Sequence, residues 1–233
     1  MNNKLKICEN VYIDKIYIIN LEFQKDLKKQ ITNQMIKYNI LDYVIFIDAV
    51  YRPDRPSYGC SLSHHKALQD MKKNNYDACM ILEDDCVLTE FPFKINDKVP
   101  EDWAMLYPGY LAYDEISYKY NNSFLRLIDA RSTHSYIVNK KYLNYMIRMT
   151  LVENIPIDMR FVCPIQNSSP CYGFYPIKAY QLIHKSTIGY DETNWNIIMD
   201  KKAEKCFNNI ETEEKIKLSN LWFNHRIEME KTL

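Results

Sequence analysis

The chain has 233 residues, which is enough for one large α/β domain or two small ones. Lysine plus arginine and aspartate plus glutamate number 30 each, so no global basic field for nucleic acid exists. The sequence contains no apolar run of about 18 residues, and its N-terminus lacks the apolar core of a signal peptide, so neither a membrane span nor secretion is expected.

The numbers and spacing of cysteine and glycine exclude further classes of protein. Seven cysteines are scattered without Cys-x-x-Cys spacing, which argues against a disulfide framework and a zinc–thiolate site. It favours a reducing compartment and therefore a cytoplasmic location. Only four glycines occur, at positions 59, 109, 173 and 189, so glycine-rich Rossmann and Walker phosphate loops are excluded.

The first predicted elements alternate between strand and helix. The β-branched and aromatic run over residues 15–21 predicts a strand. Apolar residues at helical spacing over 24–38 predict a surface helix, and residues 43–47 predict a second strand. A strand, a helix and a strand in this order indicate a right-handed parallel unit.

A loop with two prolines then leads into a helix that we expect to begin near Cys60 or Ser61. The free amides of this helix, together with Ser61 and Ser63, could face a phosphate or sugar. The alternative for Ser61 is a plain helix cap. His64 and His65 could be metal ligands, but each taken singly fits a packed or exposed histidine equally well.

The central stretch is an apolar run over residues 78–82 that ends at three consecutive carboxylates, Glu83, Asp84 and Asp85. Its length and turn-like flanks predict a buried strand. In an extended chain Glu83 and Asp85 point to the same side, roughly 6.5 Å apart, and Asp84 points the other way. At contact distance two carboxylates repel by about 4 kcal/mol at an effective dielectric of 20, and a divalent cation relieves such repulsion. Magnesium, manganese and calcium prefer such oxygen ligands, although a solvated loop or helix cap is the alternative.

The C-terminal half is expected to add shorter elements. They are strands over 100–107, 124–130 and 135–139, helices over 140–150 and from 155, apolar pieces at 172–175 and 179–183, and a charged helical tail from 203. Trp103, Tyr136 and Tyr172 are expected in the core, with stacking on a sugar or base as the alternative. The fold class is therefore α/β, with a mixed, mostly parallel central sheet flanked by helices. We expect one domain over 1–200 and a helical extension over 201–233.

Two motifs carry a resemblance to a known family. Gly59-Cys-Ser-Leu-Ser-His64 reads Gly-Cys-x-x-Ser-His, and Ile81-Leu-Glu-Asp-Asp85 is an acidic, DXD-like motif. Weaker matches lie at 16–21, 48–50, 135–138, 156–158, 181 and 186–188. Over residues 15–190 the chain resembles glycosyltransferase family 25, the family of lipooligosaccharide and collagen galactosyltransferases.

This resemblance implies a GT-A type fold and inverting transfer of a hexose, galactose or glucose, from a UDP-sugar to a hydroxyl of a glycan or glycoprotein. It also implies a manganese or magnesium ion on the donor diphosphate, where a cation acts as a Lewis acid. The implied metal ligands are Glu83, Asp85 and His184, with His225 behind His184. The implied donor contacts are Asn20, Leu21, Asp48, Ala49, Ser63, His64, Glu83 and Gln181.

The general base implied for the acceptor hydroxyl is Asp158, with Asp84 in reserve. The alternative for Asp158 is a charge at a helix N-terminus. One departure from the family concerns residues 22–28, which carry lysines where the family usually has arginines, and lysine replaces a forked arginine imperfectly. This departure slightly favours a second function, a degenerate transferase acting as a carbohydrate-binding or scaffold module. A metal-dependent nucleotidyltransferase is the third function left open.

Overall fold

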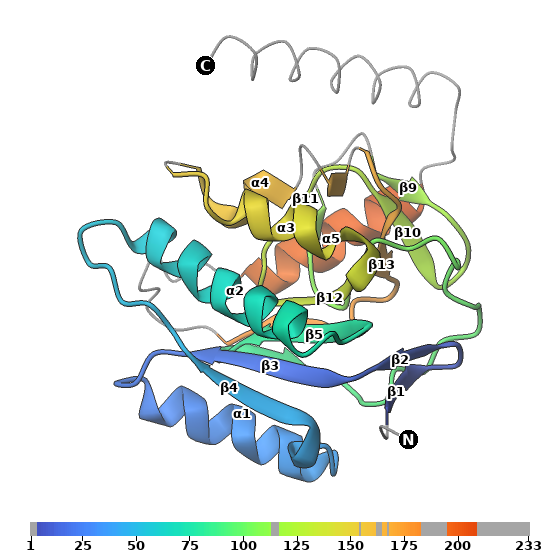
Figure 1. Ribbon diagram of the computed structural model, residues 1–233. Helices are drawn as coiled ribbons and strands as arrows, with labels where there is room; N and C mark the ends of the chain where they lie inside the picture. Colours follow the sequence, from blue (N-terminus) through green and yellow to red (C-terminus); the bar gives the residue numbers. More distant parts are fainter. Residues whose placement is uncertain are drawn as a thin grey trace, which may run out of the picture.

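The fold is built around one eight-stranded mixed sheet in the order β4-β3-β5-β12-β7-β13-β10-β9, with helices on both faces (Figure 1). The computed structural model describes residues 4–112, 117–153, 155–161, 165–166, 168–182 and 195–208. The strands are β1 (Leu5–Cys8), β2 (Val11–Ile13), β3 (Lys15–Asn20), β4 (Val44–Asp48), β5 (Ala78–Glu83), β6 (Cys86–Leu88), β7 (Met105–Tyr107), β8 (Leu111–Ala112), β9 (Tyr118–Lys119), β10 (Phe124–Leu127), β11 (Ala130–Arg131), β12 (Ser135–Asn139), β13 (Cys171–Phe174) and β14 (Ala179–Gln181). The helices are α1 (Lys25–Lys37), α2 (Pro56–Lys73), α3 (Leu143–Met149), α4 (Ile157–Phe161) and α5 (Trp195–Phe207), with 3₁₀ turns η1 (Leu41–Tyr43) and η2 (Lys140–Tyr142).

The N-terminal part of the sheet confirms the predicted parallel unit. β3 pairs in parallel with β4 on one side and with β5 on the other. Helices α1 and α2 make the two crossovers and lie on opposite faces of these strands (Figure 1). The carboxyl ends of all three strands therefore meet at one edge, the place where open α/β sheets bind ligands.

The expected α/β class with a mixed sheet and flanking helices is confirmed, but the sheet is not mostly parallel. Three pairings within it are parallel. Four are antiparallel, and they join β12 to β5 and β7, and β10 to β13 and β9. Antiparallel neighbours need no crossover helix, which suits the short connections of this part of the chain.

Alternate side chains of the central strands pack into two separate cores. On one face Tyr17 and Ile81 lie against Leu68 of α2, with α3, α4 and α5 covering the rest of that face. On the other face Ile18 and Met80 lie against α1 and the β1–β2 hairpin. Each fully buried side chain of this size contributes about 1.5–3 kcal/mol to folding, so the sheet is fixed from both sides.

Helix α2 begins at Pro56 rather than near Cys60 or Ser61, which corrects the predicted boundary. Proline at the first helical position loses no hydrogen bond and its fixed φ suits a helix, so the second proline starts the helix instead of ending the loop. Ser61 is consequently not a cap: it lies inside the helix and its hydroxyl donates to the carbonyl of Ser57 at 3.1 Å. The first turn of α2, whose amides have no partner within the helix, therefore follows Arg55 and does not lie near Cys60 or Ser61 as expected.

Glycine at position 59 is required by the close approach of α2 to the segment after β4. A Cβ atom there would lie 2.6 Å from the carbonyl oxygen of Val50 and 3.2 Å from the backbone nitrogen of Arg52. Both are backbone atoms that cannot rotate away, so only glycine lets the helix come this near. The glycine of the Gly-Cys-x-x-Ser-His motif thus sets the wall between α2 and the strand ends.

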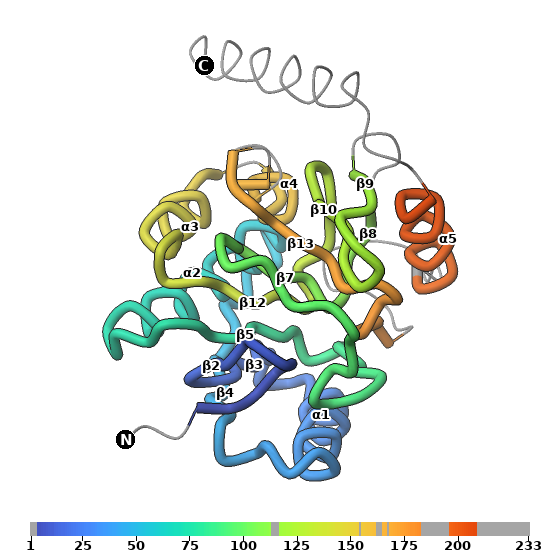
Figure 2. Tube along the Cα trace, turned by 90° about the vertical axis from the view of Figure 1, so that its right-hand side faces the viewer, coloured from blue at the N-terminus to red at the C-terminus, as the bar shows by residue number. Residues whose placement is uncertain are grey.

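Two further features bear on domain organisation. The N-terminal hairpin β1–β2 was not predicted, and it packs in the α1-side core. Helix α5 spans the expected boundary at residue 200; it lies beside β8 (Figure 2), and Met199, Ala203 and Cys206 are buried in the core. The division into a 1–200 domain and a 201–233 extension stays a prediction. No helix among the described residues is both long and apolar enough to cross a membrane.

Candidate active site

A pocket of about 510 Å³ opens at the carboxyl ends of the parallel strands β3, β4 and β5. Its walls come from the segments after these strands and from the first half of α2. The residues that line it are Ile19, Leu21, Phe23, Gln24, Ala49, Val50, Tyr51, Arg52, Pro53, Pro56, Cys60, Ser63, His64, Glu83, Asp84, Asp85 and Gln181. Three adjacent carboxylates therefore face a single arginine among the described lining residues, and that arginine already pairs with Asp54 at 2.8 Å.

The acidic stretch does not stay extended, which corrects the expected alternation of its side chains. β5 ends at Glu83, and the next two residues form a turn before β6. The turn brings Asp84 into the pocket lining beside Glu83 and Asp85 instead of directing it away. All three carboxylates are consequently available to one ligand site.

Contacts from distant parts of the chain hold the turn in place. The Asn20 amide, at the end of β3, donates to Asp84 at 2.6 Å. The Gln181 amide donates to Asp85 at 3.2 Å, and the backbone of Leu182 donates to the Asp85 carbonyl at 2.8 Å. Gln181 reaches this place because β14 pairs antiparallel with β6, directly after the acidic turn. The predicted residues Asn20 and Gln181 therefore belong to the acidic site through hydrogen bonds to its carboxylates.

Glu83 is the centre of a buried hydrogen-bond chain. Its carboxylate lies 3.2 Å from His64 Nε2 and accepts a 2.8 Å bond from the Thr133 hydroxyl. His64 Nδ1 in turn lies 2.8 Å from the Tyr136 hydroxyl, and the two rings stack with centroids 5.6 Å apart. Burial acts to raise the pKa of Glu83, but the hydrogen bonds from His64 and Thr133 and the positive field of the histidines outweigh it, so the pKa is lowered. Glu83 is therefore a carboxylate at neutral pH.

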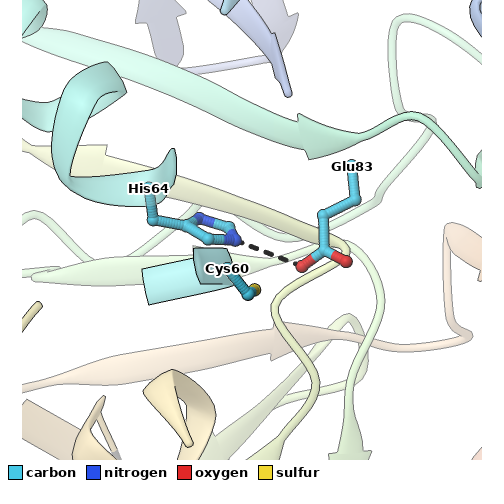
Figure 3. A group of neighbouring side chains, drawn as sticks. All are labelled: Cys60, His64 and Glu83. Carbon is cyan, nitrogen blue, oxygen red and sulfur yellow. Dashed lines mark hydrogen bonds and ion pairs between the residues drawn. The ribbon is translucent and has the colours of Figure 1, made fainter. Parts of the chain in front are cut away.

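Cys60 joins this group from the same face of α2 as His64. One ligand atom of each of Cys60, His64 and Glu83 lies within 4.8 Å of the others (Figure 3). Burial, followed by the negative charges of Glu83, Asp158 and Asp85, raises the pKa of the Cys60 thiol well above its ordinary value. The thiol is thus protonated at neutral pH and is not a reactive nucleophile.

Of the other expected donor contacts, Leu21, Ala49 and Ser63 line the pocket and Asp48 does not. Leu21 and Ala49 line the pocket, and the Ala49 amide donates to the Asn20 carbonyl at 2.9 Å. Ser63 also lines it, although its hydroxyl accepts a 2.8 Å bond from the Val50 amide and donates to the Gly59 carbonyl. Asp48 has an exposed side chain outside the lining, and its carbonyl accepts from Lys66.

Asp158 lies beside the pocket rather than in its lining. Its carboxylate accepts bonds from the backbone amides of Met159 at 2.7 Å and Ser132 at 3.3 Å, and Ser132 has a left-handed φ of 80°. These contacts sit at the start of α4, where a negative charge is favourable. Asp84, the reserve base, lies in the lining itself. His184 and His225 fall outside the described residues.

Sequence reasoning missed several parts of the site. Phe23 and Tyr51 form an edge-to-face pair at the rim, with ring centroids 5.1 Å apart and more than half of each side chain exposed. Two aromatic residues next to predicted strand ends were the available signal. Thr133 carries no local signal, because only the register of β12 against β5 brings it to Glu83. Trp103, Tyr136 and Tyr172 are buried, as expected for core residues.

No family model and no curated protein matches the chain. Several solved structures are similar to it. A protein from STIV is 14% identical, covering 73% of this chain and 86% of that one, with a TM-score of 0.45. A glycosyltransferase involved in glycosylation of the major capsid of PBCV-1 is 11% identical, covering 65% and 76%, with a TM-score of 0.38. A mutant Drosophila beta-1,4-galactosyltransferase 7 in complex with manganese, UDP-Gal and xylobiose is 11% identical, covering 84% and 76%, with a TM-score of 0.45. None of these alignments reaches a TM-score of 0.5, so the functional conclusion depends on the pocket and its side chains.

Proposed function

We propose that the protein is a metal-dependent glycosyltransferase that takes its sugar from a nucleotide sugar. One observation carries the proposal: three adjacent carboxylates and an exposed aromatic pair line one pocket at the carboxyl ends of three parallel strands. Carboxylates there suit a cation that carries phosphates, and aromatic rings suit a base or sugar. The pocket volume also falls in the range typical of small-molecule and cofactor sites.

The residues fit a divalent cation. Glu83, Asp84 and Asp85 place oxygen ligands in a pocket whose described lining supplies one arginine, so the local charge is negative. We assign Asp85 as the principal ligand and Glu83 as the second, with His184 as the candidate third. When bound, manganese or magnesium supplies Lewis-acid stabilisation of the charge that develops on the leaving diphosphate.

The donor is assigned to the groove between the acidic turn and the rim. Phe23 and Tyr51 offer exposed aromatic rings for the nucleobase, and Leu21 and Ala49 offer apolar side chains in the same lining. The amides of Asn20 and Gln181 bond to Asp84 and Asp85, respectively, and so hold these carboxylates in the orientation that we assign to cation and diphosphate binding. The finer assignments are a UDP-hexose donor, galactose or glucose, and inverting transfer within a GT-A fold of family 25 type.

The acceptor is assigned to the side of the pocket where α4 begins. Inverting transfer needs a base that removes the proton of the acceptor hydroxyl. Asp158 is our candidate, because its carboxylate lies close enough to the pocket-lining Cys60 to help raise the pKa of that thiol. Asp84 is the reserve. A glycan or glycoprotein hydroxyl in the cytoplasm is the expected acceptor class.

A nucleotide-sugar hydrolysis screen tests the proposal. The purified chain is incubated with a panel of nucleotide sugars in manganese, magnesium or EDTA, and nucleoside diphosphate, pyrophosphate and free sugar are quantified. We expect UDP release from UDP-galactose or UDP-glucose with manganese and none with EDTA. Asp85→Asn keeps the shape and the contact with Gln181 but removes the charge, so it should lower turnover by about 100-fold or more.

Glu9→Gln is the matched control. Glu9 is an exposed carboxylate in the turn of the separate β1–β2 hairpin and is not among the residues that line the pocket, so its loss should leave turnover unchanged. Pyrophosphate turnover would instead identify a nucleotidyltransferase. Nucleotide-sugar binding without any turnover would identify a carbohydrate-binding or scaffold module. Equal turnover by wild type and Asp85→Asn would refute the assignment of the cation site.

A further inference from the structure

Three side chains with different metal-binding atoms converge on the floor of the pocket. Cys60 and His64 lie one helical turn apart on α2, so both point from the same face of the helix. Glu83 reaches the same point from the end of β5 (Figure 3). The ligand atoms all lie within 4.8 Å of one another, and His64 Nε2 is already 3.2 Å from the Glu83 carboxylate.

The two outer contacts of this group hold its ligands in orientation. The Tyr136 hydroxyl lies 2.8 Å from His64 Nδ1, and the Thr133 hydroxyl donates to Glu83 at 2.8 Å. A metal-binding histidine commonly has its second ring nitrogen held by another polar group, which fixes the ring. The Tyr136 hydroxyl can donate or accept, so it suits Nδ1 both when Nε2 carries a proton and when Nε2 is free to bind a metal.

The chemistry of the three donors differs from that of the acidic turn. Oxygen-only ligands suit magnesium and manganese, whereas a thiolate with an imidazole and a carboxylate suits zinc and the borderline transition metals. Zinc bonds of about 2.0–2.3 Å need ligand atoms about 3.3–3.8 Å apart in a tetrahedron, so the side chains close by roughly 1 Å. The three residues line the pocket, which gives an ion a path to them.

We propose that Cys60, His64 and Glu83 form a second metal site that binds zinc-like divalent cations and that shares Glu83 with the cation site assigned to Asp85. Binding forms bonds from the metal to Sγ, Nε2 and a carboxylate oxygen, and it releases the thiol proton to solvent. The site requires no nucleotide sugar, so it stands whether or not the protein is a glycosyltransferase. It extends the Gly-Cys-x-x-Ser-His motif from a helix-packing element to a metal-binding one.

Cobalt titration of the full chain tests this site directly. The protein is treated with EDTA, dialysed, and titrated with Co²⁺ while its absorption spectrum is recorded. We expect visible bands of a low-coordinate cobalt centre together with an intense near-ultraviolet thiolate-to-cobalt band, and zinc should bleach both. A spectrum without the thiolate band would overturn the proposal.

Three variants assign the ligands. Cys60→Ser should lose the thiolate band, and Glu83→Gln should keep it while weakening cobalt binding by about tenfold or more, as expected for loss of a ligand. Asp85→Asn should keep the band, because Asp85 is not a ligand of this site. Survival of the band in Cys60→Ser, or its loss in Asp85→Asn with unchanged circular dichroism, would show that the assigned ligands are wrong.

Discussion

Gly59→Ala tests how the pocket wall is built, because the sign of its effect on stability depends on the close approach of α2. In a helix with free space, alanine in place of glycine stabilises by about 1 kcal/mol. Here the new methyl group would lie 2.6 Å from the Val50 carbonyl oxygen and 3.1 Å from Arg52 Cβ. Overpacking of this kind costs about 1–3 kcal/mol, and a backbone contact belongs in the upper part of that range. We therefore expect a net loss of about 1–2 kcal/mol.

Thermal unfolding measures this directly. For a domain of this size, 1 kcal/mol corresponds to about 2–4 °C, so the melting temperature of Gly59→Ala should fall by about 2–8 °C. Lys72→Ala is the control, since Lys72 is exposed near the end of the same helix and should change stability by less than about 0.5 kcal/mol. Affinity for the nucleotide should fall too, because Ser63 bonds to Val50 and moves with the helix. A melting temperature above that of wild type would refute the packing of α2 against the segment after β4.

Three other predictions concern the pocket. Tyr51→Ala should weaken nucleotide-sugar binding about 5- to 150-fold, the equivalent of about 1–3 kcal/mol for one base stack. Tyr12→Ala, which removes an exposed tyrosine on β2, should leave binding unchanged. Equal affinities of wild type and Tyr51→Ala by titration calorimetry would exclude stacking. The pKa of Glu83 is lowered, so its hydrogen bonds stabilise the fold above the usual glutamate pKa of 4.5 and lose this effect as pH falls through the folded-state value. Glu83→Gln should therefore unfold at lower urea than wild type at neutral pH, and the difference should shrink in acid; a difference independent of pH would contradict the network. Zinc should inhibit UDP release by wild type, since Glu83 serves both sites, and Cys60→Ser should be less sensitive to zinc. Identical inhibition curves for the two proteins would show that zinc inhibition does not depend on Cys60.

The part of the fold that was predictable is the part whose contacts are local. The strand at 15–21, the helix at 24–38 and the strand at 43–47 each carry a complete hydrophobic pattern, and the structure has β3, α1 and β4 there. Their order also predicted the parallel pairing of β3 and β4, because a strand–helix–strand unit in one sheet typically forms a right-handed crossover between parallel strands. The acidic residues at the end of β5 lie at the carboxyl end of a buried strand, as expected, and they line a pocket there.

The remaining features depend on contacts between distant residues. Thr133 and Tyr136 meet the Glu83–His64 pair because β12 pairs antiparallel with β5, and no local pattern in either strand specifies that neighbour. Gln181 reaches Asp85 through the β6–β14 pairing across 96 positions of sequence. The side chain of Asp84 in the turn bonds to Asn20, which is also a long-range contact. Residue types therefore indicated the chemistry of the site, and the sheet register decided its geometry.

The most direct test of the central claim is the binding of UDP by titration calorimetry with and without a divalent cation. If the carboxylates of the acidic turn hold a cation that in turn holds the donor diphosphate, UDP should bind wild type in manganese and lose its affinity in EDTA. Asp85→Asn should resemble the EDTA result even in manganese. UDP binding of equal affinity in manganese, in EDTA and in Asp85→Asn would contradict the account.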